Sequence, residues 1–168
     1  MAALNGRAPT QGRPYRGRAL TEPLEATEQT RREGTHLLVR AGEYACALPL
    51  AAVRRVVRAV TVHPLPGAAG ELEGLAEFGG EPLPVLNLGR LVNSPPGANP
   101  AFPVTVVVWV GPAGAREMVG LNADAALEVV HVADESLVAG DGGLLLGEAP
   151  VGGEVVRVLN LEALGREA

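Results

Sequence analysis

The residues Gly74–Leu91, GLAEFGGEPLPVLNLGRL, contain the pattern that decides the fold. A turn at Gly79 and Gly80 leads into Glu81–Leu86, a run that is extended in character and contains two prolines. Proline has no N–H to donate to a neighbouring strand. This strand is therefore predicted either to lie at a sheet edge or to pair only through its other residues.

The end of this stretch occurs twice in the chain. Val85–Leu91 (VLNLGRL) returns as Val158–Leu164 (VLNLEAL), 73 residues later. In the first copy, Asn87 is predicted to cap a short helix, because an Asn side chain can accept a hydrogen bond from a first-turn N–H. Leu88 and Leu91 are three residues apart and so lie on one face of that helix.

The same offset aligns other positions that share a residue type. It pairs Leu48 with Leu121, Val56 and Val57 with Val129 and Val130, and Gly74 with Gly147. One offset shared across much of the chain implies two copies of one supersecondary plan. Each copy is predicted to be a set of short antiparallel strands that ends in a helical turn. Closing each set into a small barrel protects its edges, so the fold class is all-β with two pseudo-symmetric barrels.

Composition agrees with this fold class. The 168 residues are 47% hydrophobic but only 3% aromatic, and they include 22 glycines and 14 prolines. Such a chain suits an aliphatic core, short strands and many turns. The single cysteine, Cys46, excludes an intramolecular disulfide. The N-terminus lacks a secretory pattern and the chain lacks an apolar run long enough to span a membrane, so we expect a cytoplasmic protein without membrane insertion.

The charge is unevenly distributed. Residues 1–33 hold six arginines and four glutamates, a net charge of +2, and the remainder holds eight arginines and fifteen acidic residues, a net charge of −7. An acidic body argues against nucleic acid as the main partner. Residues 1–33 show no apolar period and are predicted to be a disordered tail, followed by one folded domain at 34–168.

The order of elements within the domain can be predicted from apolar runs and turn residues. Residues 50–58 are expected to form a helical or irregular turn, 68–78 to hold one short helix, and 92–102 to be a loop. Strands are expected at 36–40, 44–48, 103–110, 117–121, 125–132 and 154–159. The run 103–110 is nearly all apolar, so both of its faces are expected to be covered.

No catalytic, cofactor or metal site is predicted. The three histidines are far apart in sequence and lack the spacing of a ligand pair: His36, His63 and His131. Cys46 lies between two alanines, as a small core residue would. Gly140–Gly143 lacks the lysine and hydroxyl residue of a phosphate-binding loop, which favours a plain turn.

Four segments in this order resemble the CheW-like domain family, and the resemblance covers about residues 35–165. They are Glu43–Leu50 with Val53, Thr61 with Pro64–Pro66, Gly74 with Leu75, and Gly80 with Pro84–Leu88. The resemblance implies two pseudo-symmetric, five-stranded, SH3-like barrels. It also implies a non-enzymatic adapter of bacterial two-component chemotaxis signalling. Such adapters couple the cytoplasmic tips of chemoreceptors to the histidine kinase CheA, whose regulatory domain has the same fold.

The resemblance also implies a protein-binding surface. Its residues would be Val53, Arg55, Val56, Arg58, Leu75, Glu77, Phe78, Gly79, Gly80 and Pro84. The chain departs from the family pattern within this set: Glu77 replaces an Asn, Gly79 replaces an Arg, and Arg55 replaces a Glu that the second copy keeps as Glu128. Arg55 belongs to a basic cluster with Arg54 and Arg58, which suits either a solvated face or an acidic partner.

Three functions therefore stand as hypotheses. The first is a chemosensory adapter that binds a CheA-type regulatory domain and a chemoreceptor tip. The second keeps the fold but serves another signalling or motility complex without coupling a kinase. The third is a small-molecule-binding or catalytic β-barrel, which would require convergent polar residues that the sequence pattern does not reveal.

Overall fold

The computed structural model describes residues 34–140 and 142–166, so the predicted tail at 1–33 lies outside the described residues. The strands are β1 (Thr35–Ala41), β2 (Tyr44–Pro49), β3 (Val53–Arg58), β4 (Leu72–Phe78), β5 (Glu81–Asn87), β6 (Val104–Val110), β7 (Glu117–Ala123), β8 (Ala125–His131), β9 (Val138–Ala139), β10 (Leu145–Val151) and β11 (Glu154–Leu159). The short helices are η2 (Leu50–Ala52), α3 (Leu88–Leu91), η3 (Asp134–Ser136) and α4 (Leu161–Arg166). The all-β class is confirmed.

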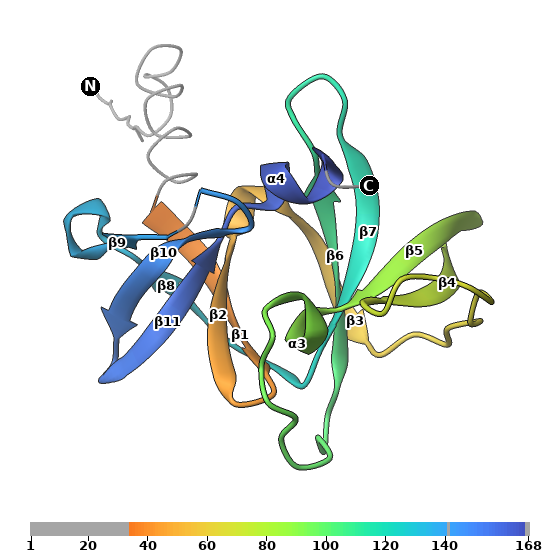
Figure 1. Ribbon diagram of the computed structural model, residues 1–168, viewed down its shortest axis with the longest axis horizontal. Helices are drawn as coiled ribbons and strands as arrows, with labels where there is room; N and C mark the ends of the chain where they lie inside the picture. The colour runs from red at the N-terminus through yellow and green to blue at the C-terminus, as the bar shows by residue number, and fades with distance from the viewer. Residues whose placement is uncertain (1–33, 141, 167–168) are drawn as a thin grey trace, which may run out of the picture.

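The strands form two sheets, each in its own lobe of the molecule (Figure 1). The first sheet has six strands in the order β8-β1-β2-β11-β10-β9, and the second has five in the order β3-β6-β7-β5-β4. Both orders have two ends, so the hydrogen bonding among the described strands does not close either sheet into the expected five-stranded barrel.

The two sheets do not correspond to the two halves of the sequence, and in this respect the prediction was wrong. The first sheet joins the β1–β2 hairpin to strands from the second half, and the second sheet joins β6–β7 to strands from the first half. The reason lies in two parallel pairs, β2 with β11 and β5 with β7. A tight turn cannot connect parallel neighbours, so each hairpin takes its parallel partner from the other half of the chain.

The internal repeat is nevertheless visible in the element bounds. At the offset of 73 residues, β4 corresponds to β10, β5 to β11, and α3 to α4. The first hairpins differ in their turns, which span residues 42–43 in one copy and 111–116 in the other. Under this correspondence the strand order of the second sheet, β3-β6-β7-β5-β4, matches β8-β1-β2-β11-β10, which are the first five strands of the first sheet.

Three aliphatic cores hold the lobes together. One lies inside each curled sheet, and the largest lies between the two sheets. Strand β6 belongs to two of them: Val106 and Val108 pack in the central core, whereas Val107 packs inside the second sheet. This alternation confirms that both faces of 103–110 are covered, because successive side chains of a strand point to opposite faces.

Two segments that were expected to be helical or irregular are strands. Val53–Arg58 is strand β3, because its β-branched valines pair with β6. Leu72–Phe78 is strand β4, where a short helix was predicted. Gly74 makes this strand possible: its φ is 146°, and a Cβ there would collide with the backbone of His63. Pairing between distant residues overrides the local preference at both places.

The prolines of β5 are accommodated because this strand pairs with β7 only through its other residues, which is one of the two predicted alternatives. Strand β5 pairs with β4 along most of its length, but with β7 only over Val85–Asn87. Pro82 and Pro84 therefore face no ladder on the β7 side. The missing N–H groups of these prolines leave the parallel pairing intact.

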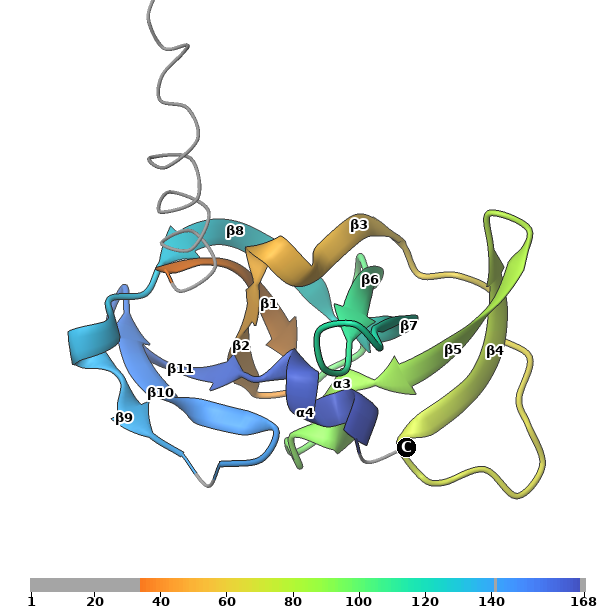
Figure 2. The same cartoon turned by 90° about the horizontal axis from the view of Figure 1, so that it is seen from above.

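The helical turns behave as predicted. The Arg90 backbone N–H donates to Asn87 Oδ1 at 2.9 Å, which caps α3. In the second copy, the Glu162 N–H donates to Asn160 Oδ1 at 3.2 Å. Leu88 and Leu161 are buried in the central core. Seen from above, α3 and α4 lie between the two lobes, so these helical turns cover the seam between the sheets (Figure 2).

Candidate protein-binding surface

All the residues predicted for binding lie on one sheet. They come from β3, from β4, from the turn after β4, and from β5. However, β3 and β4 are at opposite ends of the strand order. The chain beyond β3 curls back to β4, where His63 and Leu75 exchange backbone hydrogen bonds of 2.8 and 3.0 Å. This bridge joins the two groups of predicted residues on one lobe.

Strand β3 is unusually exposed for a strand. Its arginines all face solvent, Val56 is 39% exposed, and Val53 and Val57 are half-buried. The strand ends its sheet and pairs with β6 alone among the described strands. A strand with a single neighbour leaves alternate backbone N–H and C=O groups available to another chain.

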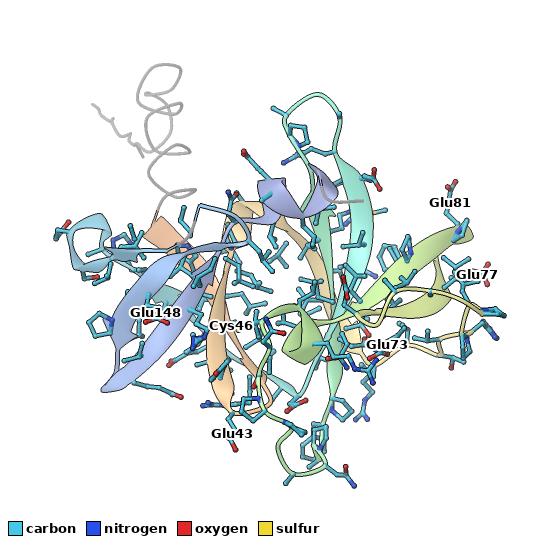
Figure 3. All side chains as sticks on the ribbon, viewed as in Figure 1. Glu43, Cys46, Glu73, Glu77, Glu81 and Glu148 are labelled. Carbon is cyan, nitrogen blue, oxygen red and sulfur yellow. The ribbon has the colours of Figure 1, made fainter. Side chains whose placement is uncertain are left out.

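The β4–β5 hairpin carries the second group of predicted residues. Glu77 and Glu81 project from its tip (Figure 3). The turn between them is formed by Gly79 and Gly80, with φ values of 62° and 84°. Two consecutive positive φ angles match the type I′ turn of two-residue hairpins, and glycine adopts them without a Cβ clash.

The remaining predicted residues are half-buried within the hairpin. Leu75 and Pro84 are directly opposite each other in the β4–β5 register, and Phe78 packs against the core inside this sheet. The structure does not bring Arg55 against Gly79, because a Cβ built on Gly79 meets no heavy atom within 4 Å. A contact between these two positions would need the full length of an arginine side chain.

A polar network near the hairpin was not anticipated from the sequence. Both carboxylate oxygens of Glu73 accept side-chain N–H groups, from Asn87 at 2.7 Å and from Asn122 at 2.8 Å. The Thr105 hydroxyl donates to Asn122 Oδ1 at 2.6 Å and accepts from the Val60 N–H at 3.1 Å. The network thus ties β4, β5, β6, β7 and the segment after β3 together.

Three residues of this network, Glu73, Asn87 and Asn122, line a cleft of about 570 Å³ between α3 and the loop before β6. Each network oxygen already accepts a hydrogen bond from within the protein. The sequence signal was weak, since Asn87 was identified only as a helix cap. Glu73 is 14 residues from Asn87 and 49 from Asn122, separations that carry no local pattern.

Among the described residues, the groups with shifted pKa values are Arg40, Cys46 and Glu154. Burial raises the pKa of the Cys46 thiol to about 12, so the thiol stays protonated as an inert core group (Figure 3). Hydrogen bonding from Arg40 lowers the pKa of Glu154, a pair on the lobe away from β3. Within residues 34–140 and 142–166, no group of three or more His, Cys, Asp or Glu side chains is placed to hold a metal ion.

The predicted residues belong to an exposed part of the fold. It presents an open strand edge, a projecting hairpin and exposed apolar and charged side chains on a fold with three cores. In the described part of the chain, no helix is long and apolar enough to cross a membrane.

Comparisons with known proteins identify the family. The sequence profile of the CheW-like domain matches residues 35–168, and the chain belongs to this family. The crystal structure of the scaffolding protein TtCheW from Thermoanaerobacter tengcongensis has a similar fold. It aligns with a TM-score of 0.66 and 19% sequence identity, over 77% of this chain and 90% of that one. No curated protein sequence matches the chain. The family is one of non-catalytic scaffolds.

Proposed function

We propose that this protein is a non-enzymatic chemosensory adapter that couples chemoreceptor tips to a CheA-type histidine kinase in the bacterial cytoplasm. Membership of the CheW-like family carries the proposal. Scaffold proteins act by holding partners together, and the exposed residues of β3 and the β4–β5 hairpin offer surfaces for that purpose. The partners would be the kinase regulatory domain and the cytoplasmic tip of a receptor.

The binding surface of the proposal consists of the ten residues on β3 and the β4–β5 hairpin. Exposed Val56 and half-buried Leu75 and Phe78 supply apolar contact area. The charged side chains around them supply orientation and specificity, since rim charges steer association more than they add affinity. The Glu73 network fixes the end of the hairpin away from its Gly79–Gly80 turn, since Glu73 accepts hydrogen bonds from Asn87 and Asn122.

A second candidate keeps the scaffold role but changes the partner. Arg55, Glu77 and Gly79 differ from the residues that the family pattern favours at these positions. Such replacements at a contact surface favour another signalling or motility complex, in which no kinase is coupled. A charge reversal at an interface rejects the original partner as well as admitting a new one.

Co-elution of the purified protein with a CheA-type regulatory domain tests the proposal. We expect one complex on size-exclusion chromatography, weakened by Val56→Asp on β3 but not by Val155→Asp. Val155 is a matched control, because it is 61% exposed and lies on the opposite lobe. Absence of any complex with the kinase domain would favour the second candidate. Equal weakening by both variants would reject β3 as the contact surface.

A further inference from the structure

The arginines of the folded domain fall into two groups. Four of them have partners: Arg40 pairs with Glu154 at 2.8 Å, Arg157 with Glu148 at 3.1 Å, Arg90 donates to the Gly70 carbonyl at 2.8 Å, and Arg116 lies over the Trp109 ring. The other three described side chains, Arg54, Arg55 and Arg58, are all on β3 and are exposed. They make no hydrogen bond, ion pair or ring contact within the described residues.

The unpaired charges coincide with the open edge of the sheet. Side chains alternate along Arg55–Arg58, so Val56 and Arg58 lie on one face and Arg55 on the other. The pairing with β6 shifts by one residue between Val53 and Arg55, so Arg54 is the extra residue of a bulge beside them. The face of β3 that carries Val56 thus also carries the charge of Arg58. The outer edge of β3 hydrogen-bonds to no other described strand. Addition of a strand to such an edge is a recurrent way of binding an extended peptide.

The corresponding strand on the other lobe lacks this character. At the offset of 73 residues, Leu127, Glu128 and His131 on β8 stand in the places of Arg54, Arg55 and Arg58. Strand β8 also ends its sheet and is also exposed, with Val129 at 56%. The two open edges are therefore alike in geometry and differ in charge. An acidic segment would distinguish them, because it meets arginines at β3 and a carboxylate at β8.

We infer that β3 is a docking edge for an extended, acidic segment of a partner protein. The segment adds as a strand beside β3, with carboxylates near its arginines and an apolar side chain on Val56. The inference rests on the proposed adapter function and specifies the polarity of its interface: the partner's contacting strand is acidic. The net charge of −7 on residues 34–168 repels such a segment elsewhere, which confines it to this strand.

Two fluorescein-labelled peptides serve as probes: ETVTETVTE, which presents Glu, Val and Glu on one face, and the uncharged QTVTQTVTQ. Anisotropy at low salt should show about tenfold tighter binding of the acidic peptide, since charge-assisted contacts are lost in the other. Replacing the three arginines by Gln should remove that preference, whereas replacing them by Lys should largely keep it. A charge-balanced variant combines the three Arg→Gln changes with Gln at three exposed acidic positions away from β3, so that its net charge equals that of the wild type. These positions are Glu43, Glu117 and Glu135.

The outcomes separate this inference from the adapter function. If a CheA-type regulatory domain binds and the Gln variant binds it equally well, the adapter function stands and the inference fails. If that domain does not bind but the acidic peptide still requires the arginines, the inference stands and the kinase partner is wrong. Equal affinity for the two peptides overturns the inference. Self-association that needs both the arginines and Glu128 also overturns it, because β3 would then meet a second copy. Unchanged melting temperatures will show that the variants remain folded.

Discussion

The cleft beside α3 and its counterpart beside α4 line up position by position, yet they are built from different chemistry. On the α3 side, Glu73, Asn87, Asn122 and Thr105 form a continuous hydrogen-bonded network. The corresponding residues on the α4 side are Leu146, Asn160, Pro49 and His36, around a cleft of about 470 Å³. For β1 and β6 the offset is 69 residues, because the turn after β6 is four residues longer than the turn after β1. Only the Asn that caps each helix is common to both.

This difference shows which features the fold needs and which are particular to one copy. The cap and the leucine that follows it occur in both copies, so they belong to the shared plan. The Glu73 network occurs once, on the lobe that carries the proposed binding surface. We infer that the network serves the β4–β5 hairpin rather than the fold as a whole, and five predictions test the comparison.

The largest expected effect is at the shared leucines. Leu88→Ala and Leu161→Ala should each lower the free energy of unfolding by about 2–5 kcal/mol, because both side chains are fully enclosed. Denaturant titration would measure the loss. Leu127→Ala is the control, since Leu127 is 44% exposed and should lose far less. A loss at only one of the two leucines would break the equivalence of the copies.

The second prediction concerns the network that one copy lacks. Glu73→Leu, which copies the residue on the other side, should cost about 1–3 kcal/mol, because the amides of Asn87 and Asn122 lose their acceptor. The reciprocal change, Leu146→Glu, should be nearly neutral because Leu146 is 45% exposed. Chemical denaturation of both variants decides the matter. Equal losses would mean that the network is not specific to its lobe.

The sequence predicted the local parts of this comparison and missed the distant ones. The cap at Asn87 and the burial of Leu88 depend on residues within one helical turn, so their pattern is readable. The exchange of hairpins between sheets depends on pairings such as Val85 with Gly120, which no local signal encodes. The strand at Val53–Arg58 was missed for the same reason. For the candidate site, the structure shows that the predicted residues share one lobe, while their role in binding stays a prediction.

The third prediction compares two turns with nearly the same backbone. Gly79 and Gly152 correspond in the repeat, with φ values of 62° and 58°, and an added Cβ would meet nothing within 4 Å at either. Alanine at each should therefore cost only the backbone strain, roughly 1–2 kcal/mol. Thermal or chemical unfolding should give similar losses. A clear difference would show that the two hairpins are not equivalent.

Arginine at the same two glycines adds a charge to that strain. The first copy has Arg55 on β3, whereas the corresponding residue of the second copy is Glu128. Repulsion at an exposed site is small, about 1 kcal/mol or less. Gly79→Arg should thus lose slightly more, and adding Arg55→Glu should recover part of the loss at low salt but less at high salt. Strict additivity at low salt would show that positions 55 and 79 are not neighbours.

The smallest effect is expected at an ion pair that only one hairpin has. Arg40 donates to both carboxylate oxygens of Glu154, at 2.8 and 3.3 Å, and so ties the tip of the β10–β11 hairpin to β1. On the other lobe, Glu81 corresponds to Glu154 but Trp109 takes the place of Arg40. Hydrogen bonding from Arg40 lowers the pKa of Glu154 below its ordinary value. The pair therefore stabilises the fold above the unfolded-state pKa of the glutamate, and this contribution is lost as the pH falls through the folded-state pKa.

Glu154→Gln should accordingly lower stability at pH 7 by less than about 1 kcal/mol, as for exposed pairs in general. The loss should disappear in acid, where the wild-type carboxylate is protonated as well. Glu81→Gln is the matched control, because Trp109 stands in the place of Arg40 there, and it should leave stability at pH 7 nearly unchanged. A loss from Glu154→Gln that persists in acid would mean that the side chain acts through packing instead of charge. If the prediction holds, the Arg40–Glu154 pair anchors the tip of the β10–β11 hairpin to a neighbouring strand, and the tip that carries Glu77 and Glu81 lacks such a pair among the described residues. The tip without the pair is the one on the proposed binding surface.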